Sequence, residues 1–146
     1  MKPFPHRYSA NVSAVPEGNL CAVSEGFPPL AVDGPVEFDG PGDQWTPEAL
    51  LMAAVADCLV LTFRAVAKAS GLEWVAIECV SEGVLDKVER RAQFTEVYTT
   101  ATLKVPAATD VETATRLLHK AEQNCFVSNS LSAAKHFSCE VEVVNG

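Results

Sequence analysis

The stretch that decides the fold is Trp45-Thr-Pro-Glu-Ala-Leu-Leu-Met-Ala-Ala-Val-Ala-Asp-Cys58-Leu-Val-Leu-Thr-Phe63. Thr46 is a good N-cap, and Pro47 suits the first helical position because its missing N–H would have no partner there. From Ala49 to Phe63, Asp57 is the only charged residue, and apolar side chains fall on every face of the helix. The apolar run is too short for a membrane span, which needs about 20 residues. The pattern therefore predicts a helix over 47–70, buried at the centre of the fold.

Length and composition indicate one globular domain, residues 1–146, in a reducing environment. Hydrophobic residues make up 48% of the chain and charged residues 21%, which is typical of a globular protein. The net charge of −8 argues against a nucleic-acid partner, and no basic run favours a membrane surface. The N-terminal residues lack the apolar core of a secretory signal. The five cysteines form an odd set without a CxxC pair, so we expect no metal site, no cofactor, no secreted disulfide framework and a cytoplasmic location.

Apolar alternation and turn residues predict strands on both sides of the central helix. Before it, the pattern predicts a hairpin with strands at 8–15 and 20–23, then a loop at 27–43 with one short strand near 30–32. Gly71 ends the helix. Beyond it, the predicted elements are strands at 74–86 and 93–105 joined by a turn at 87–91, a helix capped by Asp110, a loop at 126–131 and a strand at 139–144. This order of elements predicts an α+β domain.

Side-chain periodicity assigns faces within these elements. The period-2 rule puts Val97, Ala101, Leu103 and Val105 on one face of strand 93–105, and Phe94 and Tyr98 on the other. In the second helix, apolar residues recur at three- and four-residue steps, so Cys125 falls at its end on the core-facing side. The strands and the second helix offer too little apolar surface to bury every face of a central helix that is apolar all round. This shortfall favours a dimer in which two chains share one core.

Two cysteine motifs give the chain a family resemblance. The first is Thr46-Pro-Glu48-Ala-Leu-Leu, followed ten residues after Glu48 by Cys58. The second is Ala121-Glu-Gln-Asn-Cys125-Phe-Val-Ser-Asn-Ser-Leu131. Together they resemble the OsmC/Ohr family of thiol-dependent organic hydroperoxide reductases and osmotically induced relatives. The resemblance covers the chain from about residue 45 to its end.

The resemblance implies a fold, a partner and a set of site residues. It implies an intertwined homodimer in which β-sheets wrap around long central helices. Cys58 matches the peroxide-attacking cysteine, Cys125 the resolving cysteine and Glu48 the carboxylate of the site. The implied substrate is an organic hydroperoxide, and a dithiol would reduce the Cys58–Cys125 disulfide. We expect an apolar entrance lined by Phe27, Phe38, Trp45, Phe126 and Leu131, which favours alkyl or lipid hydroperoxides over hydrogen peroxide.

The sequence departs from this family at the cation that steadies the reactive thiolate. In the peroxidases that cation is an arginine in the first hairpin turn, whereas the matching turn here, Pro16-Glu17-Gly18-Asn19, has none. Arg7 is the only arginine before the central helix. Arg64 lies about 240° around the helix from Cys58 and points away from it. Arg90 and Arg91, in the second hairpin, reach a site only if a dimer brings them there.

Simpler interpretations stand beside the catalytic one. Buried cysteines usually serve as packing residues, which is how we interpret Cys21, Cys79 and Cys139. Glu48 is also explained as a first-turn carboxylate, and Asp57 as a buried acid paired across the core. The chain as a whole is then either a non-catalytic dimer that binds a small apolar ligand or a redox sensor with a Cys58–Cys125 disulfide.

Overall fold

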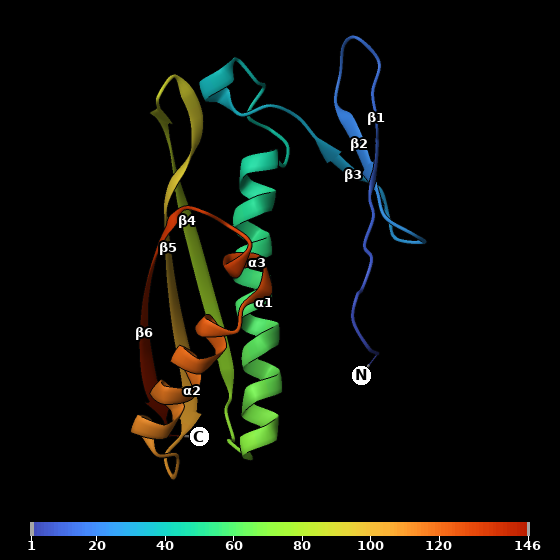
Figure 1. Ribbon diagram of the computed structural model, residues 1–146. Coiled ribbons are helices and arrows are strands. Elements are labelled where there is room, and N and C mark those ends of the chain that lie inside the picture. Colours follow the sequence, from blue (N-terminus) through green and yellow to red (C-terminus); the bar gives the residue numbers. More distant parts are fainter. Residues whose placement is uncertain (1, 146) are drawn as a thin grey trace. The chain divides into compact units, whose positions relative to one another are not determined.

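The computed structural model describes residues 2–145, which form two compact units (Figure 1). The first unit extends to Leu50 and the second begins at Leu51, so the division falls near the start of the long helix α1 (Pro47–Ser70). Each unit has its own three-stranded sheet. The architecture is α+β, as the order of elements predicts.

The N-terminal unit is a small antiparallel sheet in the order β1-β2-β3, with strands Asn11–Ser13, Leu20–Val23 and Leu30–Val32. The predicted hairpin is confirmed, with Val12 opposite Ala22, but β1 is shorter than the predicted strand 8–15. A 3-10 turn at Val36–Phe38 follows β3 within the predicted loop. Most side chains of this unit are exposed.

Helix α1 has the predicted bounds because both of its ends are marked by strong local signals. The Thr46 hydroxyl oxygen accepts from the Ala49 N–H at 3.1 Å, and Gly71 follows the last turn with φ of +69°. Glycine adopts this left-handed conformation without the steric cost that a Cβ brings.

Burial of α1 differs from the expectation of a helix covered on all sides. Its buried residues are Val55, Leu59, Phe63 and Ala67, which form a single stripe. By length and composition alone α1 is long and apolar enough to cross a membrane, contrary to the expectation from the shorter run. That test is also passed by core helices of soluble proteins, and the physical finding is that the C-terminal unit covers only one face of α1.

The C-terminal unit is a sheet in the order β4-β5-β6, with strands Ala76–Val88, Arg91–Pro106 and Ala134–Val144. Strand β5 is antiparallel to β4 and parallel to β6. The hairpin turn is tighter than predicted, because Glu89 and Arg90 alone make it, with φ of 50° and 71°. Positive φ at both central residues is the conformation that matches the twist of the two strands.

The core of this unit lies between β5 and two helices, α1 and α2 (Val111–Gln123) (Figure 1). Ala101, Leu103 and Val105 of β5 pack against Leu59, Phe63 and Ala67 of α1 and against Ala114, Leu117, Leu118 and Ala121 of α2. The Asp110 carboxylate caps α2 by accepting from the Glu112 N–H at 3.3 Å and the Thr113 hydroxyl at 2.7 Å. Figure 1 shows both helices beside this sheet.

The predicted position of Phe94 is wrong, and a β-bulge is the reason. Val84 pairs with Glu96 and Leu85 pairs with Phe94, so Thr95 is an extra residue on β5. One inserted residue reverses the alternation of side chains on that strand. Phe94 therefore packs against the core at Val97 instead of sharing the outer face with Tyr98.

The segment after α2 is more ordered than the predicted loop. Cys125 is followed by a four-residue helix, α3 (Phe126–Asn129). Strand β6 then begins at Ala134, five residues before the predicted strand. This return path places Cys125 and the first amides of α3 against the middle of α1, as the contacts of Cys125 with Val55 and of Cys58 with Val127 show.

Candidate functional site

Cys58 lies on α1 beside the buried stripe and is only half-buried. Burial raises the pKa of its thiol, but hydrogen bonds from the Val127 N–H, the Cys125 thiol, the Thr62 hydroxyl and the Phe126 N–H outweigh it, and the pKa is lowered. The amides at the start of α3 have no partner within that short helix and are therefore available as donors to the sulfur. Their donors favour the charged form of the sulfur.

Cys125 lies in the short connection between α2 and α3 and is buried, with 1% of its surface exposed. Its Sγ donates to the Val55 carbonyl oxygen at 3.9 Å. Burial raises the pKa of Cys125 to about 11, and the hydrogen bond to Cys58 raises it as well. The two thiols therefore have distinct states. Cys58 is the thiol that loses its proton first, and Cys125 is the thiol that keeps its proton.

Glu48 is in the first turn of α1, within the N-terminal unit. One carboxylate oxygen, Oε1, is shielded from solvent and has no hydrogen-bond partner among residues 2–145. A buried carboxylate oxygen without a hydrogen bond costs folding free energy, so we expect a hydrogen-bond donor beside this atom. The structure brings Cys58 and Cys125 together but does not join Glu48 to them.

An apolar groove of about 500 Å³ opens beside Cys58. Its lining residues are Ala54, Asp57, Cys58, Leu61, Thr62 and Ala65 of α1 with Phe126 and Val127 of α3. Of the predicted entrance residues, only Phe126 is among them, while Leu131 packs in the core and the other three belong to the N-terminal unit. Helical periodicity in the sequence predicts the α1 part of this lining, because residues 54, 58, 61 and 65 recur at three- and four-residue steps and so share one face.

Asp57 is an exposed lining residue of this groove and not the buried, paired acid that the sequence suggests. It has no hydrogen bond or ion pair among the contacts of the described chain. Besides the cysteine, it is the only ionisable residue that lines the groove. The lining of the groove therefore offers apolar carbon, one hydroxyl, one thiol and one carboxylate.

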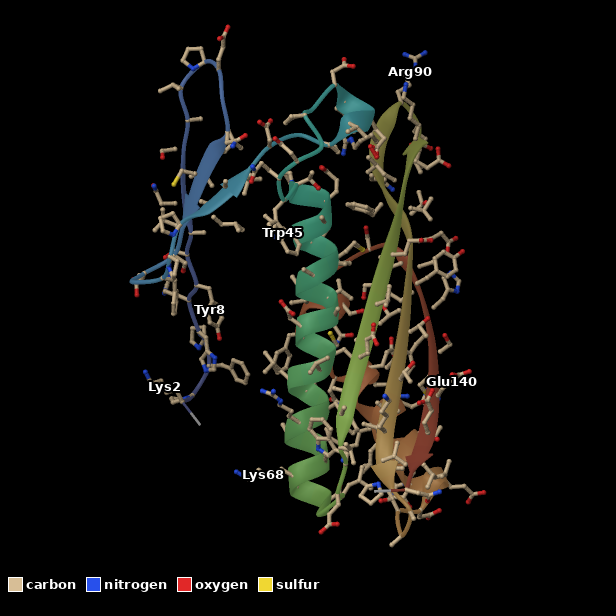
Figure 2. The ribbon with its side chains drawn as sticks, turned by 180° about the vertical axis from the view of Figure 1, so that it is seen from behind. Lys2, Tyr8, Trp45, Lys68, Arg90 and Glu140 are labelled. Carbon is tan, nitrogen blue, oxygen red and sulfur yellow. The ribbon has the colours of Figure 1, made fainter. Side chains whose placement is uncertain are left out.

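No charged group contributes to the lowered pKa of Cys58 within the described part of the chain. Arg64 is exposed on α1, and Arg90 lies at the tip of the β4–β5 hairpin (Figure 2). Sequence reasoning looked for a cation beside Cys58 and missed the backbone amides of α3. Amides carry no side-chain signature, so only the fold reveals them.

All five cysteines are free thiols, and Cys79 is near enough to Cys125 and Asp57 that, besides burial, their charges raise its pKa. Cys79 and Cys139 are partly buried and pack against the core, and burial raises the pKa of Cys79 to about 11. Cys139 lies 3.8 Å from His119 Nε2. Among residues 2–145, no cluster of three or more His, Cys, Asp or Glu side chains is placed to hold a metal ion.

Comparison with known proteins identifies the family. The sequence profile of the OsmC-like protein family matches residues 40–140, which include both cysteine motifs. The chain belongs to the OsmC-like family. Uncharacterized protein YmaD of Bacillus subtilis is 28% identical over 139 residues, which span 93% of this chain and 87% of YmaD.

Solved structures show the OsmC-like fold. An OsmC-like protein of unknown function from Vibrio cholerae superposes with a TM-score of 0.86 at 16% identity, over 93% of this chain and 100% of that one. An organic hydroperoxide resistance protein OsmC from Legionella pneumophila gives 0.74 at 22% identity, over 97% of this chain and 100% of that one. At these identities the likeness establishes the fold alone.

Proposed function

We propose that this OsmC-like chain is a thiol-dependent reductase of organic hydroperoxides. The observation that carries the proposal is the pairing of two unlike thiols beside a groove: Cys58 with a lowered pKa and Cys125 with a raised one. A thiolate is the form that attacks a peroxide. The neighbouring Cys125 thiol supplies the sulfur for the second step, in which the departing hydroxide takes its proton.

The proposed reaction balances over three steps. The Cys58 thiolate attacks one peroxide oxygen, the O–O bond breaks, and the alkoxide takes a proton and leaves as an alcohol, so that Cys58 becomes a sulfenic acid. Cys125 then attacks the Cys58 sulfur, the S–O bond breaks, and hydroxide leaves as water with the Cys125 proton. A dithiol reductant restores both thiols by exchange and is itself oxidised to a disulfide.

The groove supports an organic substrate over hydrogen peroxide. Leu61, Ala65 and Phe126 offer apolar surface to an alkyl chain, which hydrogen peroxide lacks. The carboxylate of Asp57 disfavours a second negative charge in the same space. We therefore assign neutral alkyl hydroperoxides as the preferred class.

A second copy of the chain is part of the proposal. The face of α1 opposite its buried stripe exposes Leu61, 59% of whose surface meets solvent. A helix with apolar residues on all sides needs cover on all sides. We propose a cytoplasmic homodimer in which the partner chain covers this face, and in which Glu48 obtains the donor that its Oε1 lacks.

A non-catalytic role is the second candidate. It is favoured by one observation, the absence of any charged group among the causes of the lowered pKa of Cys58 within the described chain. In that case the groove binds a small apolar ligand and the thiols turn over slowly or not at all. A redox sensor is the variant in which the Cys58–Cys125 disulfide forms but no turnover follows.

Turnover with a dithiol separates these functions. Wild-type protein with cumene hydroperoxide and dihydrolipoamide is expected to consume peroxide catalytically, and Cys58→Ser to lose at least about a thousandfold in rate because no other thiol has its environment. Cys21→Ser, in the N-terminal sheet, is the matched control and should behave like wild type. If Cys58→Ser and Cys21→Ser have the same rates as wild type, or if wild type shows none, the reductase proposal is wrong.

A further inference from the structure

Thr62 is one helical turn beyond Cys58 and contacts it at two atoms. Its hydroxyl donates to the Cys58 carbonyl oxygen at 2.7 Å. The same oxygen, Oγ1, lies 4.0 Å from the Cys58 Sγ. Thr62 and Cys58 both line the groove.

One hydroxyl proton cannot serve both acceptors at full strength. While Cys58 is a thiol, the hydroxyl donates to the carbonyl and its oxygen is free to accept from the S–H. Once the sulfur is charged, it becomes the stronger acceptor, since hydrogen bonds to ionised groups are about twice as strong as neutral ones. A rotation about the Cα–Cβ or C–O bond is enough to redirect the proton, because the donor is already in place.

The need for such a donor follows from the rest of the site. Asp57 on α1 and Cys79 on β4 lie near this part of the core, and Glu122, Lys135 and His136 line a small cavity together with Cys125. None of these charged groups is among the causes of the lowered pKa of Cys58. Neutral donors must therefore supply the stabilisation of the thiolate, and Thr62 is the side-chain hydroxyl among them.

We propose that Thr62 is a positioning residue whose hydroxyl turns from the Cys58 carbonyl to the Cys58 sulfur when that sulfur loses its proton. Through this bond Thr62 holds the thiolate toward the groove. The inference rests on the proposed function for its purpose, but it concerns the thiol itself and is measured without peroxide. The alternative is that Thr62 only satisfies a helical carbonyl, as threonines in helices often do.

Alkylation of Cys58 as a function of pH tests the proposal. Thr62→Val removes the hydroxyl at similar shape, and Thr62→Ser keeps it. With iodoacetamide and peptide-resolved mass spectrometry, Thr62→Val is expected to move the midpoint for Cys58 upward by about half to one pH unit, which is a three- to tenfold slower reaction below the midpoint. Thr62→Ser should return the midpoint to that of wild type. Thr115→Val, on α2, is the matched control and should leave it unchanged.

The outcomes are distinct. An unchanged or lower midpoint in Thr62→Val overturns the proposal, as does failure of Thr62→Ser to restore it. If Thr62→Val does not fold by circular dichroism, Thr62→Ala, which favours the helix, takes its place with the same expectation. A shifted midpoint in a protein without peroxide turnover would sustain the role of Thr62 and reject the reductase proposal, so the two failures are distinguishable.

Discussion

The two faces of α1 have similar composition but different surroundings. One face, Val55, Leu59, Phe63 and Ala67, is buried under the sheet and α2. The other, including Ala54, Leu61 and Ala65, opens to the groove. Cys58 and Thr62 lie between the two. Apolar character on this helix therefore has one observed and one proposed use: the first face stabilises the chain, and the second is where we propose that a substrate and a second copy bind.

Truncating one leucine on each face should give the largest contrast in stability. Leu59→Ala leaves a cavity in the core and is expected to lower the free energy of unfolding by about 2–5 kcal/mol. Leu61→Ala, on the exposed face, should cost less than about 1 kcal/mol within a single chain. Urea unfolding followed by circular dichroism measures both, at a protein concentration where gel filtration shows a monomer. Equal losses would mean that the two faces are not different in the way described.

A charge on the open face should separate the two copies. Leu61→Glu places a carboxylate where the partner is proposed to pack, and an unpaired buried charge is strongly unfavourable. The expected result is a shift from the dimer mass to the monomer mass in gel filtration with light scattering. Arg64→Glu, a charged substitution at an already charged and exposed position, is the control. A wild-type protein that is monomeric at micromolar concentration contradicts the proposed dimer.

The two thiols should titrate in opposite directions from their ordinary values. Because the pKa of Cys58 is lowered, its thiolate fraction rises at lower pH than that of an ordinary cysteine, whereas Cys125, with a pKa of about 11, remains a thiol up to strongly alkaline pH. At pH 8 iodoacetamide should label Cys58 roughly a hundredfold faster than Cys125. Cys79 has a similarly raised pKa and serves as the comparison cysteine. Comparable labelling of Cys58 and Cys79 would contradict the assignment.

The smallest expected effect concerns the charge on the open face. Asp57→Asn removes the groove's negative charge and should raise the rate with a carboxylate-bearing hydroperoxide by about threefold, since exposed charges interact weakly in water. The rate with cumene hydroperoxide, which is neutral, should stay the same. Steady-state kinetics with the two substrates measures this ratio. An unchanged ratio would remove Asp57 from the specificity of the groove.

The sequence predicts most of the C-terminal unit because its signals are local. Thr46, Pro47 and Gly71 mark the ends of α1, and the structure has the same bounds. The period-2 rule failed only at Phe94, because an inserted residue in one strand leaves no mark in the alternation. The first strand is shorter than its apolar pattern, since pairing with β2 involves only Asn11–Ser13.

The site is predicted less completely than the fold. The motifs single out Cys58 and Cys125, and the structure brings them together. The amides of Phe126 and Val127 were not predicted, because a four-residue helix is too short to show a period. Exposure of Asp57 was also missed, since an apolar helix in sequence does not reveal which face one chain leaves open.

The most direct measurement of the central claim is the disulfide that one equivalent of cumene hydroperoxide produces in the reduced protein. Intact-mass spectrometry should show the loss of two hydrogens, and peptide mapping should assign the bond to Cys58 and Cys125, while Cys21, Cys79 and Cys139 remain free thiols. In Cys125→Ser the same treatment should stop at a Cys58 sulfenic acid that dimedone traps. A protein whose Cys58 stays reduced, or whose Cys58 bonds to a cysteine other than Cys125, would contradict the account.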